Sequence, residues 1–216
     1  HVTGHGESSP VIRTWVHNES VVLGIQDHRL PHIEEGMQLL RAAGYEPIVR
    51  NSGGLAVVLD PGVLNISLVF KENEPTSIDT AFGYMVDFVK ALFPEVAEKI
   101  EAYEIVGSYC PGTYDLSING KKFAGISQRR MQNGIAVQIY LCIEGNGAKR
   151  AQLIRDFYEV SLQGKETKFT YPTVVPSVMA SIQELTSTPI TVTEVNMRIQ
   201  SLLLEWDPET ALCPLP

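Results

Sequence analysis

The dipeptide Asn119-Gly120 separates two stretches in which polar and apolar residues alternate, and it restricts the fold more than any other feature of this chain. Two-residue turns of this composition join antiparallel strands, because asparagine and glycine both tolerate the positive φ angles that the turn requires. The predicted strands are residues 115–118 before the turn and residues 122–126 after it. The sequence therefore predicts an antiparallel hairpin, which returns Lys122 toward the residues that precede the first strand.

The rest of the chain predicts several strands, some adjacent in sequence, with helices between them. We expect strands at residues 20–25, 48–50, 56–59, 64–70 and 135–143, and helices at residues 31–43, 80–93, 148–163, 176–185 and 191–206, with a further short helix that ends at residue 100. The last helix begins with a capping box, in which Thr191 is followed three residues later by Glu194. This order predicts an α+β fold with mixed, largely antiparallel sheets and flanking helices.

The length of 216 residues suits one α+β domain with a substantial core. We expect residues 1–165 to form that core and residues 166–216 to form a C-terminal helical segment packed on it, with residues 165–175 as the connection. The chain begins with His1 and has no initiator methionine. We therefore expect it to be a piece of a longer protein with a truncated N-terminus.

Charge, hydropathy and cysteine usage restrict the partners and the compartment. The net charge of −8 excludes nucleic acid as a partner, since nucleic-acid binding depends on a basic face. No apolar run approaches the ~18 to 20 residues of a membrane span, and no signal-peptide pattern is present, so no membrane association is expected. The three cysteines form an odd set without a C-x-x-C pair, which indicates a reducing, cytoplasmic setting. Among them, Cys142 is expected in the core, and Cys213 in the tail is expected to have no role.

A metal site is not expected. His28 and His32 are four residues apart, which would place two imidazoles on one face of a helix, but Pro31 lies between them and interrupts a continuous helix. No acidic residue occupies the glutamate position of an H-E-x-x-H pattern. The histidines are therefore interpreted as ordinary polar residues.

Cys110 lies in a loop that precedes the hairpin, and Pro111 predicts an extended backbone for it. Connections commonly display reactive groups, and the hairpin brings Lys122 toward this end, where an ammonium favours thiolate over thiol. The pair is a candidate nucleophile and cation. The alternative is a cysteine that acts as a small buried hydrophobe and a lysine that is a solvated surface charge. A basic cluster of Lys121, Lys122, Arg129 and Arg130 is a candidate docking surface for acidic carrier domains.

The segment Arg50-Asn51-Ser52-Gly53-Gly54-Leu55-Ala56-Val57 is the second candidate site. Paired glycines between strands let a ligand approach the backbone closely and expose amide groups to an acyl oxygen or a phosphate. The spacing matches neither a Walker A motif nor a dinucleotide-binding fingerprint. On the glycines alone, a tight hairpin turn without a binding role is the better explanation of the segment.

Several motifs occur together in an order that resembles the lipoate-protein ligase, biotin ligase and octanoyltransferase superfamily. They are Trp15-Val16-His17, Val21-Val22-Leu23-Gly24-x-x-Asp27, Arg50-x-Ser52-Gly53-Gly54-x-Ala56-Val57, Gly62-x-x-Asn65 and Lys122-x-x-Gly125-x-x-Gln128-Arg129. They extend over residues 15–145, more than half of the chain. The resemblance implies a lipoate/biotin ligase-like catalytic domain, with residues 1–165 as an acyltransferase core.

Within the superfamily, the sequence is most similar to the branch that moves an octanoyl group from octanoyl-lysine of the glycine cleavage H protein to the lipoyl-domain lysine of 2-oxoacid dehydrogenase E2 subunits. The resemblance implies that Cys110 accepts the acyl group as a thioester and that Lys122 is the active-site lysine. It also implies that Arg50, Ser52, Gly53, Gly54 and Asn65 line the acyl pocket. Amide groups near Gly125 are expected to assist at the developing oxyanion.

Departures from the pattern bear on cofactors and on rival functions. Nucleotide-using lipoate ligases typically have a third glycine where this chain has Leu55 and a second arginine where it has Asn51, so we expect no ATP and no other cofactor. The N-terminal helix of the superfamily is also missing from the sequence. The rivals are an octanoyltransferase that uses acyl carrier protein as donor, an ATP-dependent lipoate ligase, and a non-catalytic lipoyl-domain binder. The presence of both Cys110 and Lys122 argues against the last of these.

Overall fold

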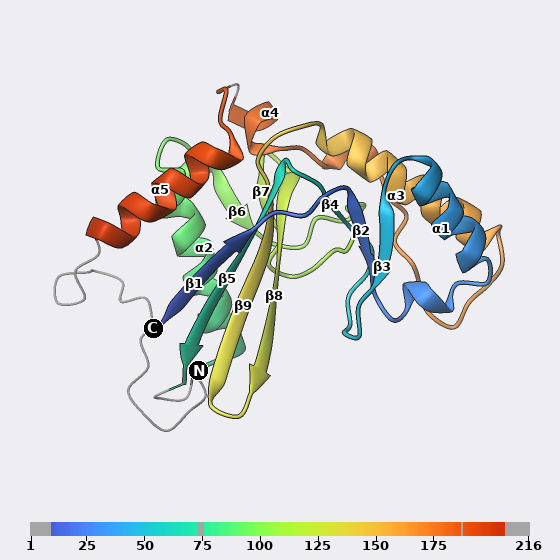
Figure 1. The fold of residues 1–216 in the computed structure, drawn as a ribbon, viewed down its shortest axis with the longest axis horizontal. Helices are drawn as coiled ribbons and strands as arrows, with labels where there is room; N and C mark the ends of the chain where they lie inside the picture. Colours follow the sequence, from blue (N-terminus) through green and yellow to red (C-terminus); the bar gives the residue numbers. More distant parts are fainter. Residues whose placement is uncertain (1–9, 73–75, 187, 206–216) are drawn as a thin grey trace.

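The larger sheet of the protein contains the predicted hairpin. The computed structural model describes residues 10–72, 76–186 and 188–205. Six strands, each antiparallel to its neighbours, form the sheet (Figure 1). In spatial order they are β1 (Val11–Trp15), β5 (Val63–Lys71), β9 (Gly134–Cys142), β8 (Lys121–Met131), β7 (Leu116–Ile118) and β6 (Ile100–Ala102). Asn119 and Gly120 join β7 to β8 with φ angles of 53° and 72°, which confirms the predicted turn.

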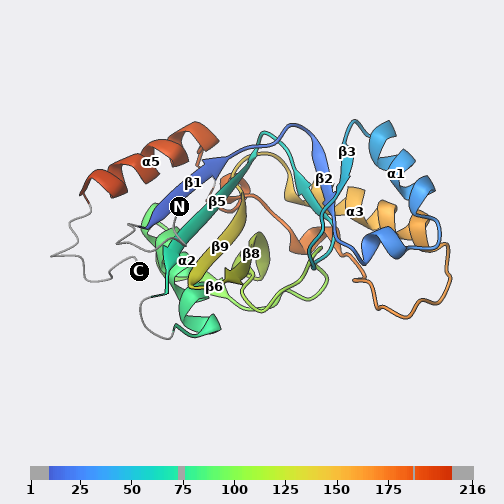
Figure 2. The ribbon, with the colours of Figure 1, turned by 60° about the horizontal axis from the view of Figure 1, so that its bottom comes forward.

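A smaller sheet lies beside the large one and carries helices on one side. Its strands, β3 (Glu46–Val49), β2 (Ser20–Leu23) and β4 (Val57–Leu59), occur in that spatial order. β2 is parallel to β3 and antiparallel to β4, so the connection from β2 to β3 must cross over and includes α1 (Ile33–Ala42). α1 packs against α3 (Gly147–Leu162), and the two helices cover the small sheet (Figure 1, Figure 2). The fold is therefore α+β with mixed, largely antiparallel sheets, as predicted.

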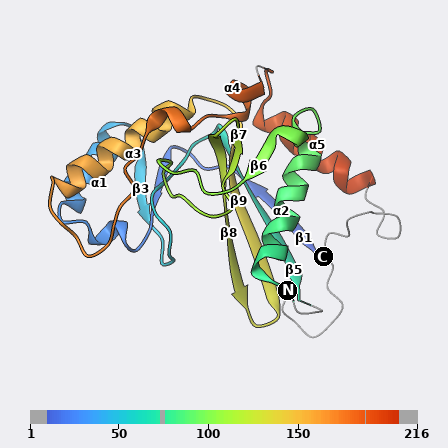
Figure 3. The same ribbon diagram turned by 180° about the vertical axis from the view of Figure 1, so that it is seen from behind.

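The two faces of the large sheet differ in chemistry, because polar and apolar side chains alternate along its central strands. One face is apolar and packs against α2 (Ile78–Leu92), which in turn contacts α5 (Val192–Glu205) (Figure 3). The opposite face carries two rows of paired residues, which are Trp15, Asn65, Tyr140 and Gly125 in the first and Arg13, Ser67, Gln138 and Ser127 in the second. We call this surface the polar face. Asn65, Ser67 and Tyr140 on this face are buried, whereas Arg13, Gln138 and Ser127 are exposed, so the face combines buried polar groups with access from solvent.

The C-terminal part differs from the prediction in one element. The single helix expected at residues 176–185 is wrong, since the chain forms a 3₁₀ turn at Pro176–Val178 and then α4 (Ile182–Thr186). Between them, Met179 forms a parallel bridge with Lys122, and the Ala180 amide donates to the Lys122 carbonyl at 2.9 Å. This pairing with β8 is a tertiary contact that helical periodicity does not reveal. The division of the chain after residue 165 stays a prediction.

Smaller differences occur elsewhere. The short helix expected to end at residue 100 is a 3₁₀ turn, Ala97–Lys99, which leads into β6. The capping box at α5 is confirmed, because Thr191 and Glu194 exchange side-chain to backbone hydrogen bonds. The predicted end of that helix, Trp206, and the tail residue Cys213 lie outside the described residues. None of the helices in the described ranges is long and apolar enough to cross a membrane.

Candidate active site

A cavity of about 610 Å³, called the main cavity below, lies between the polar face of the large sheet and the loop that joins β3 to β4. A smaller recess of about 130 Å³ shares part of its wall and extends toward Trp15. Cys110 lines the main cavity. All residues expected to bind substrate line one or both of these spaces; they are Arg50, Ser52, Gly53, Gly54, Asn65 and Gly125. The structure therefore brings together residues that are up to 75 positions apart in the sequence, from Arg50 to Gly125.

Cys110 is half-buried, and its Sγ accepts a hydrogen bond from the Leu55 amide at 3.4 Å. The extended backbone predicted for this residue is wrong, because Cys110 has a left-handed conformation with φ of 45°. Such a conformation costs a residue other than glycine roughly 1–2 kcal/mol. Contacts from distant segments, at the Sγ and at the Cys110 carbonyl, hold the loop in this shape and outweigh the local preference set by Pro111.

Lys122 is fully buried beneath the Cys110 loop. Its Nζ donates to the carbonyls of Cys110 and Tyr109 at 2.9 and 3.0 Å, and to the Ser108 hydroxyl at 3.2 Å. It also forms an ion pair with Asp115, with Nζ 2.9 Å from Oδ1. An ammonium has three hydrogens, and these four acceptors already share them. The hairpin thus delivers Lys122 to the Cys110 loop as predicted, but the ammonium contacts the backbone of the loop rather than the thiol.

Asp115 was not singled out from the sequence, although it is the buried counter-ion of Lys122. Its carboxylate also accepts the amides of Ile105 and Gly112, each at 3.2 Å. Burial raises the pKa of Asp115 above its usual range, and the Lys122 ammonium counteracts part of that rise. The side chain therefore ties both ends of the segment 105–112 to the ammonium and fixes the loop that carries Cys110.

Arg50, which lies within the β3–β4 loop, holds the shape of that loop through hydrogen bonds to its backbone. The Arg50 Nε donates to the Gly53 carbonyl at 3.0 Å, and its Nη2 donates to the Leu55 carbonyl at 2.9 Å. Gly54 has φ of 88°, and a Cβ placed there would lie 2.3 Å from the Arg50 Nη2 and 3.7 Å from the Cys110 Sγ. Gly53 has open space around the equivalent position. The two adjacent glycines therefore have different roles, and only Gly54 needs to lack a side chain.

This difference predicts that Gly54→Ala destabilises the protein by about 1–2 kcal/mol, because the left-handed backbone is sterically unfavourable for alanine and not for glycine. The added methyl group also displaces the Arg50 guanidinium that holds the loop. Gly53→Ala is the matched control and should change the free energy of unfolding by less than about 0.5 kcal/mol. Urea denaturation of both variants measures the difference. Equal stabilities would contradict the assigned role of Gly54.

A buried hydrogen-bond network supports the same loop from behind. The Asp27 carboxylate accepts the Gly24 amide at 2.7 Å and the Tyr158 hydroxyl at 2.9 Å, and that hydroxyl accepts the Ala56 amide at 3.4 Å. A Cβ at Gly24 would lie 1.9 Å from the Gly54 carbonyl oxygen, so the two turns are in direct contact. Burial raises the pKa of Asp27 to about 6. The motif Gly24-x-x-Asp27 is therefore explained by support of the glycine loop.

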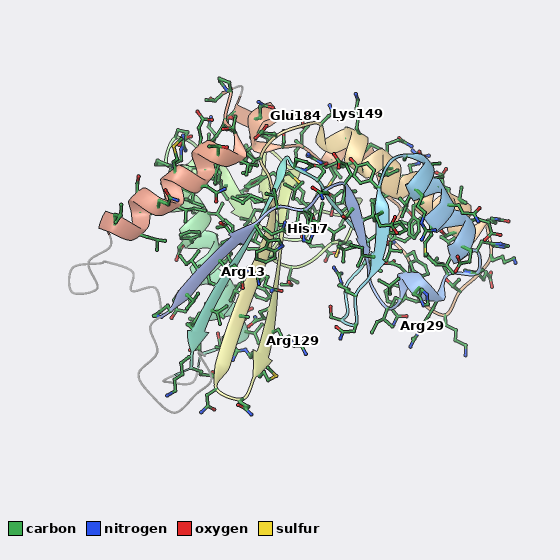
Figure 4. The ribbon with its side chains drawn as sticks, viewed as in Figure 1. Arg13, His17, Arg29, Arg129, Lys149 and Glu184 are labelled. Atoms are coloured by element: carbon green, nitrogen blue, oxygen red, sulfur yellow. The ribbon has the colours of Figure 1, made fainter. Side chains whose placement is uncertain are left out.

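The predicted basic cluster is not a single surface. Lys122 is buried, and Arg130 is directed at Glu72 and at the carbonyls of Thr76 and Ser77. Arg129 alone among the four lines the main cavity, where it projects from β8 (Figure 4). Within the described ranges, no group of three or more histidine, cysteine or acidic residues could hold a metal ion.

A family model and similar proteins of known name both relate the chain to enzymes that act on lipoyl or octanoyl groups. A family model described as the lipoyl protein ligase A/B catalytic domain matches residues 1–203. A Lysinibacillus sphaericus protein named octanoyl-[GcvH]:protein N-octanoyltransferase is 68% identical over 203 residues, which cover 94% of this chain and 73% of that protein. A protein of the same name from Exiguobacterium sibiricum is 59% identical over 194 residues, which cover 90% of this chain and 71% of that protein.

Solved structures show the same fold at low sequence identity. A lipoate-protein ligase A bound with ATP is 19% identical, with a TM-score of 0.64, and the match covers 90% of this chain and 72% of that one. An archaeal bipartite lipoate protein ligase from Thermoplasma acidophilum, studied with its E2 lipoyl domain, is 18% identical, with a TM-score of 0.57 and coverage of 90% and 70%. At these identities the likeness concerns the fold alone.

Proposed function

The chain belongs to the lipoyl protein ligase A/B catalytic domain family, and from that premise we propose that it is a protein N-octanoyltransferase. It takes an octanoyl group from octanoyl-lysine of the glycine cleavage H protein and gives it to the lipoyl-domain lysine of 2-oxoacid dehydrogenase E2 subunits. The observation that carries the proposal is the Cys110 thiol, which lies in the wall of a cavity large enough for an acyl chain. The names of relatives at 68% and 59% identity support the H protein as donor.

The proposed reaction proceeds in two acyl transfers through Cys110. The sulfur attacks the carbonyl carbon of the octanoyl amide, the C–N bond breaks, and the thiol proton leaves with the amine of the H-protein lysine. The lysine of the lipoyl domain then attacks the thioester, the C–S bond breaks, and the thiol is restored. Exchange of one amide for another is nearly balanced in free energy. A covalent intermediate replaces one difficult step with two easier ones and needs no activation by a nucleotide.

The surrounding residues support this chemistry in different ways. The Leu55 amide donates to the Cys110 Sγ and so helps to fix the position of the sulfur in the cavity wall. Lys122 and Asp115 hold the loop rigid, which keeps the sulfur at one place in the cavity wall. The acyl chain occupies the main cavity and the recess, between Arg50, Asn65 and the rest of the lining. A cytoplasmic location, expected from the odd cysteine count, is part of the proposal.

The donor is tested by mass spectrometry. The protein is incubated separately with octanoyl-H protein and with octanoyl-acyl carrier protein, and the peptide that contains Cys110 is analysed. We expect a mass increase of one octanoyl group with the H protein only. Acylation by the acyl carrier protein alone would assign the rival transferase function, and acylation by neither carrier would exclude the thioester mechanism.

ATP and magnesium are expected neither to bind nor to stimulate the reaction, and free octanoate should not be a substrate. Leu55 has a side chain at the position where the family resemblance implies a glycine in nucleotide-using ligases, and Asn51 lacks the positive charge of the arginine implied there. Isothermal titration with Mg-ATP should give no binding heat. ATP-dependent octanoylation of a lipoyl domain from free octanoate would overturn the transferase assignment in favour of a ligase.

A further inference from the structure

Tyr140 has a buried hydroxyl group for which the described residues offer no hydrogen-bond partner. The side chain is 9% exposed and projects from the polar face of β9, where it lines both the main cavity and the recess. A buried hydroxyl without a partner costs about 1–3 kcal/mol relative to one in water. The other buried groups that lack a partner belong to His32, Ser117, Arg150 and Ser161, and none of these lines either space. Tyr140 alone in this set offers an unused donor to a bound ligand.

Two neighbours fix the position of this hydroxyl. The Lys122 Nζ lies 5.8 Å from the centre of the Tyr140 ring, so the ring covers the ammonium that holds the Cys110 carbonyl. On β8, Gly125 is paired with Tyr140, and a Cβ there would lie 2.6 Å from the ring and 3.0 Å from the hydroxyl oxygen. The absence of a side chain at Gly125 therefore makes room for the tyrosine. This gives the glycine of the Lys122-x-x-Gly125 motif a role that differs from the amide donor expected from the sequence.

The protonation state of Tyr140 suits a donor. Burial raises its pKa above the usual range, and the electrostatic influence of Tyr109, Asp115 and Cys110 acts in the same direction. The hydroxyl therefore keeps its proton at neutral pH. A neutral donor that is itself buried from water interacts strongly with a charge that develops beside it.

We propose that Tyr140 donates a hydrogen bond to the carbonyl oxygen of the octanoyl group while Cys110 attacks that group. The inference rests on the proposed function and adds a catalytic residue to it. As the C–S bond forms, the carbonyl oxygen becomes negatively charged, and the Tyr140 hydroxyl stabilises this charge without transferring its proton. The oxygen regains its double bond when the C–N bond breaks. The same contact acts in the second transfer, when the lipoyl-domain lysine attacks the thioester.

The experiment compares Tyr140→Phe with the unmodified chain. The rate of Cys110 acylation by octanoyl-H protein, followed by intact mass, should fall by about 10²–10³-fold, the usual effect of losing one oxyanion donor. The alkylation rate of Cys110 with iodoacetamide should stay within about twofold, since that reaction forms no oxyanion. The thermal midpoint should not fall, because the hydroxyl that is removed has no partner. Tyr45→Phe is the matched control, since its hydroxyl contacts Asp60 and it lines neither space.

The outcomes separate this inference from the proposed function. If the unmodified chain is acylated and Tyr140→Phe is acylated equally fast, the role of Tyr140 is excluded while the transferase assignment stands. If the alkylation rate falls as much as the acylation rate, Tyr140 acts on the thiol or on the loop, and the inference is again wrong. If the unmodified chain is not acylated by any octanoyl carrier, the proposed function itself fails.

Discussion

Cys110→Ala is expected to reduce octanoyl transfer by at least about 10³-fold, because the variant has no atom that can hold the acyl group. The fold should persist. Cys110 lies in a loop, is only half-buried, and contributes one long hydrogen bond through its sulfur. Alanine meets the same left-handed backbone as cysteine, so the substitution changes the nucleophile and leaves the conformational cost at this position unchanged. Transfer of octanoyl from the H protein to a lipoyl domain, followed by mass spectrometry, measures the effect.

Cys142→Ala is the matched control for this variant. Cys142 is fully buried in the core, 4.0 Å from the Tyr109 hydroxyl, and lines neither the main cavity nor the recess. Burial raises the pKa of its thiol, which makes it unreactive. The variant should lose about 1 kcal/mol of stability and keep its transfer rate. Substantial transfer by Cys110→Ala, or acyl groups found on the Cys142 peptide, would exclude the proposed nucleophile.

Lys122→Met is expected to lower the free energy of unfolding by about 3–5 kcal/mol and to abolish transfer. The substitution leaves the Asp115 carboxylate buried without its counter-ion, and it frees the carbonyls of Tyr109 and Cys110 that the ammonium holds. Lys121→Met is the matched control. Lys121 is exposed and points to the other side of the strand, so its loss should change stability by less than about 0.5 kcal/mol.

A double variant separates stability from chemistry at Lys122. Combining Lys122→Met with Asp115→Asn removes both charges, and the asparagine oxygen still accepts a backbone amide, so part of the lost stability should return. Transfer should not return, because the Cys110 carbonyl stays unheld. Recovery of activity together with stability would show that the lysine serves the fold alone.

Local sequence signals predicted those parts of the site that depend on local geometry. The Asn119-Gly120 turn predicted the hairpin, and Lys122 is the second residue of the strand that returns from it. Proximity of Lys122 to the Cys110 loop follows from these two facts. The paired glycines indicated the β3–β4 loop, although the sequence did not distinguish the constrained Gly54 from the open Gly53.

Features set by non-local contacts were missed or predicted wrongly. The conformation of Cys110 depends on Leu55 and Lys122, and a rule based on Pro111 alone does not include either contact. The sequence pattern does not single out Tyr140, because the strand at residues 135–143 is mainly apolar. A signal was present in the alternation of Gln138 and Tyr140 with apolar neighbours on β9, matched by Asn65 and Ser67 on β5. Comparing paired strands, rather than single ones, would have revealed the polar face.

At position 110, the left-handed backbone makes the residue that is best for stability different from the residue that the proposed activity needs. Glycine adopts a φ of 45° without steric cost, whereas cysteine pays roughly 1–2 kcal/mol for it. Selection for thermal tolerance alone would therefore favour glycine at this position and would eliminate the sulfur. An engineer who seeks a more durable protein has to gain stability at sites remote from this loop, because the most direct local improvement also removes the proposed nucleophile.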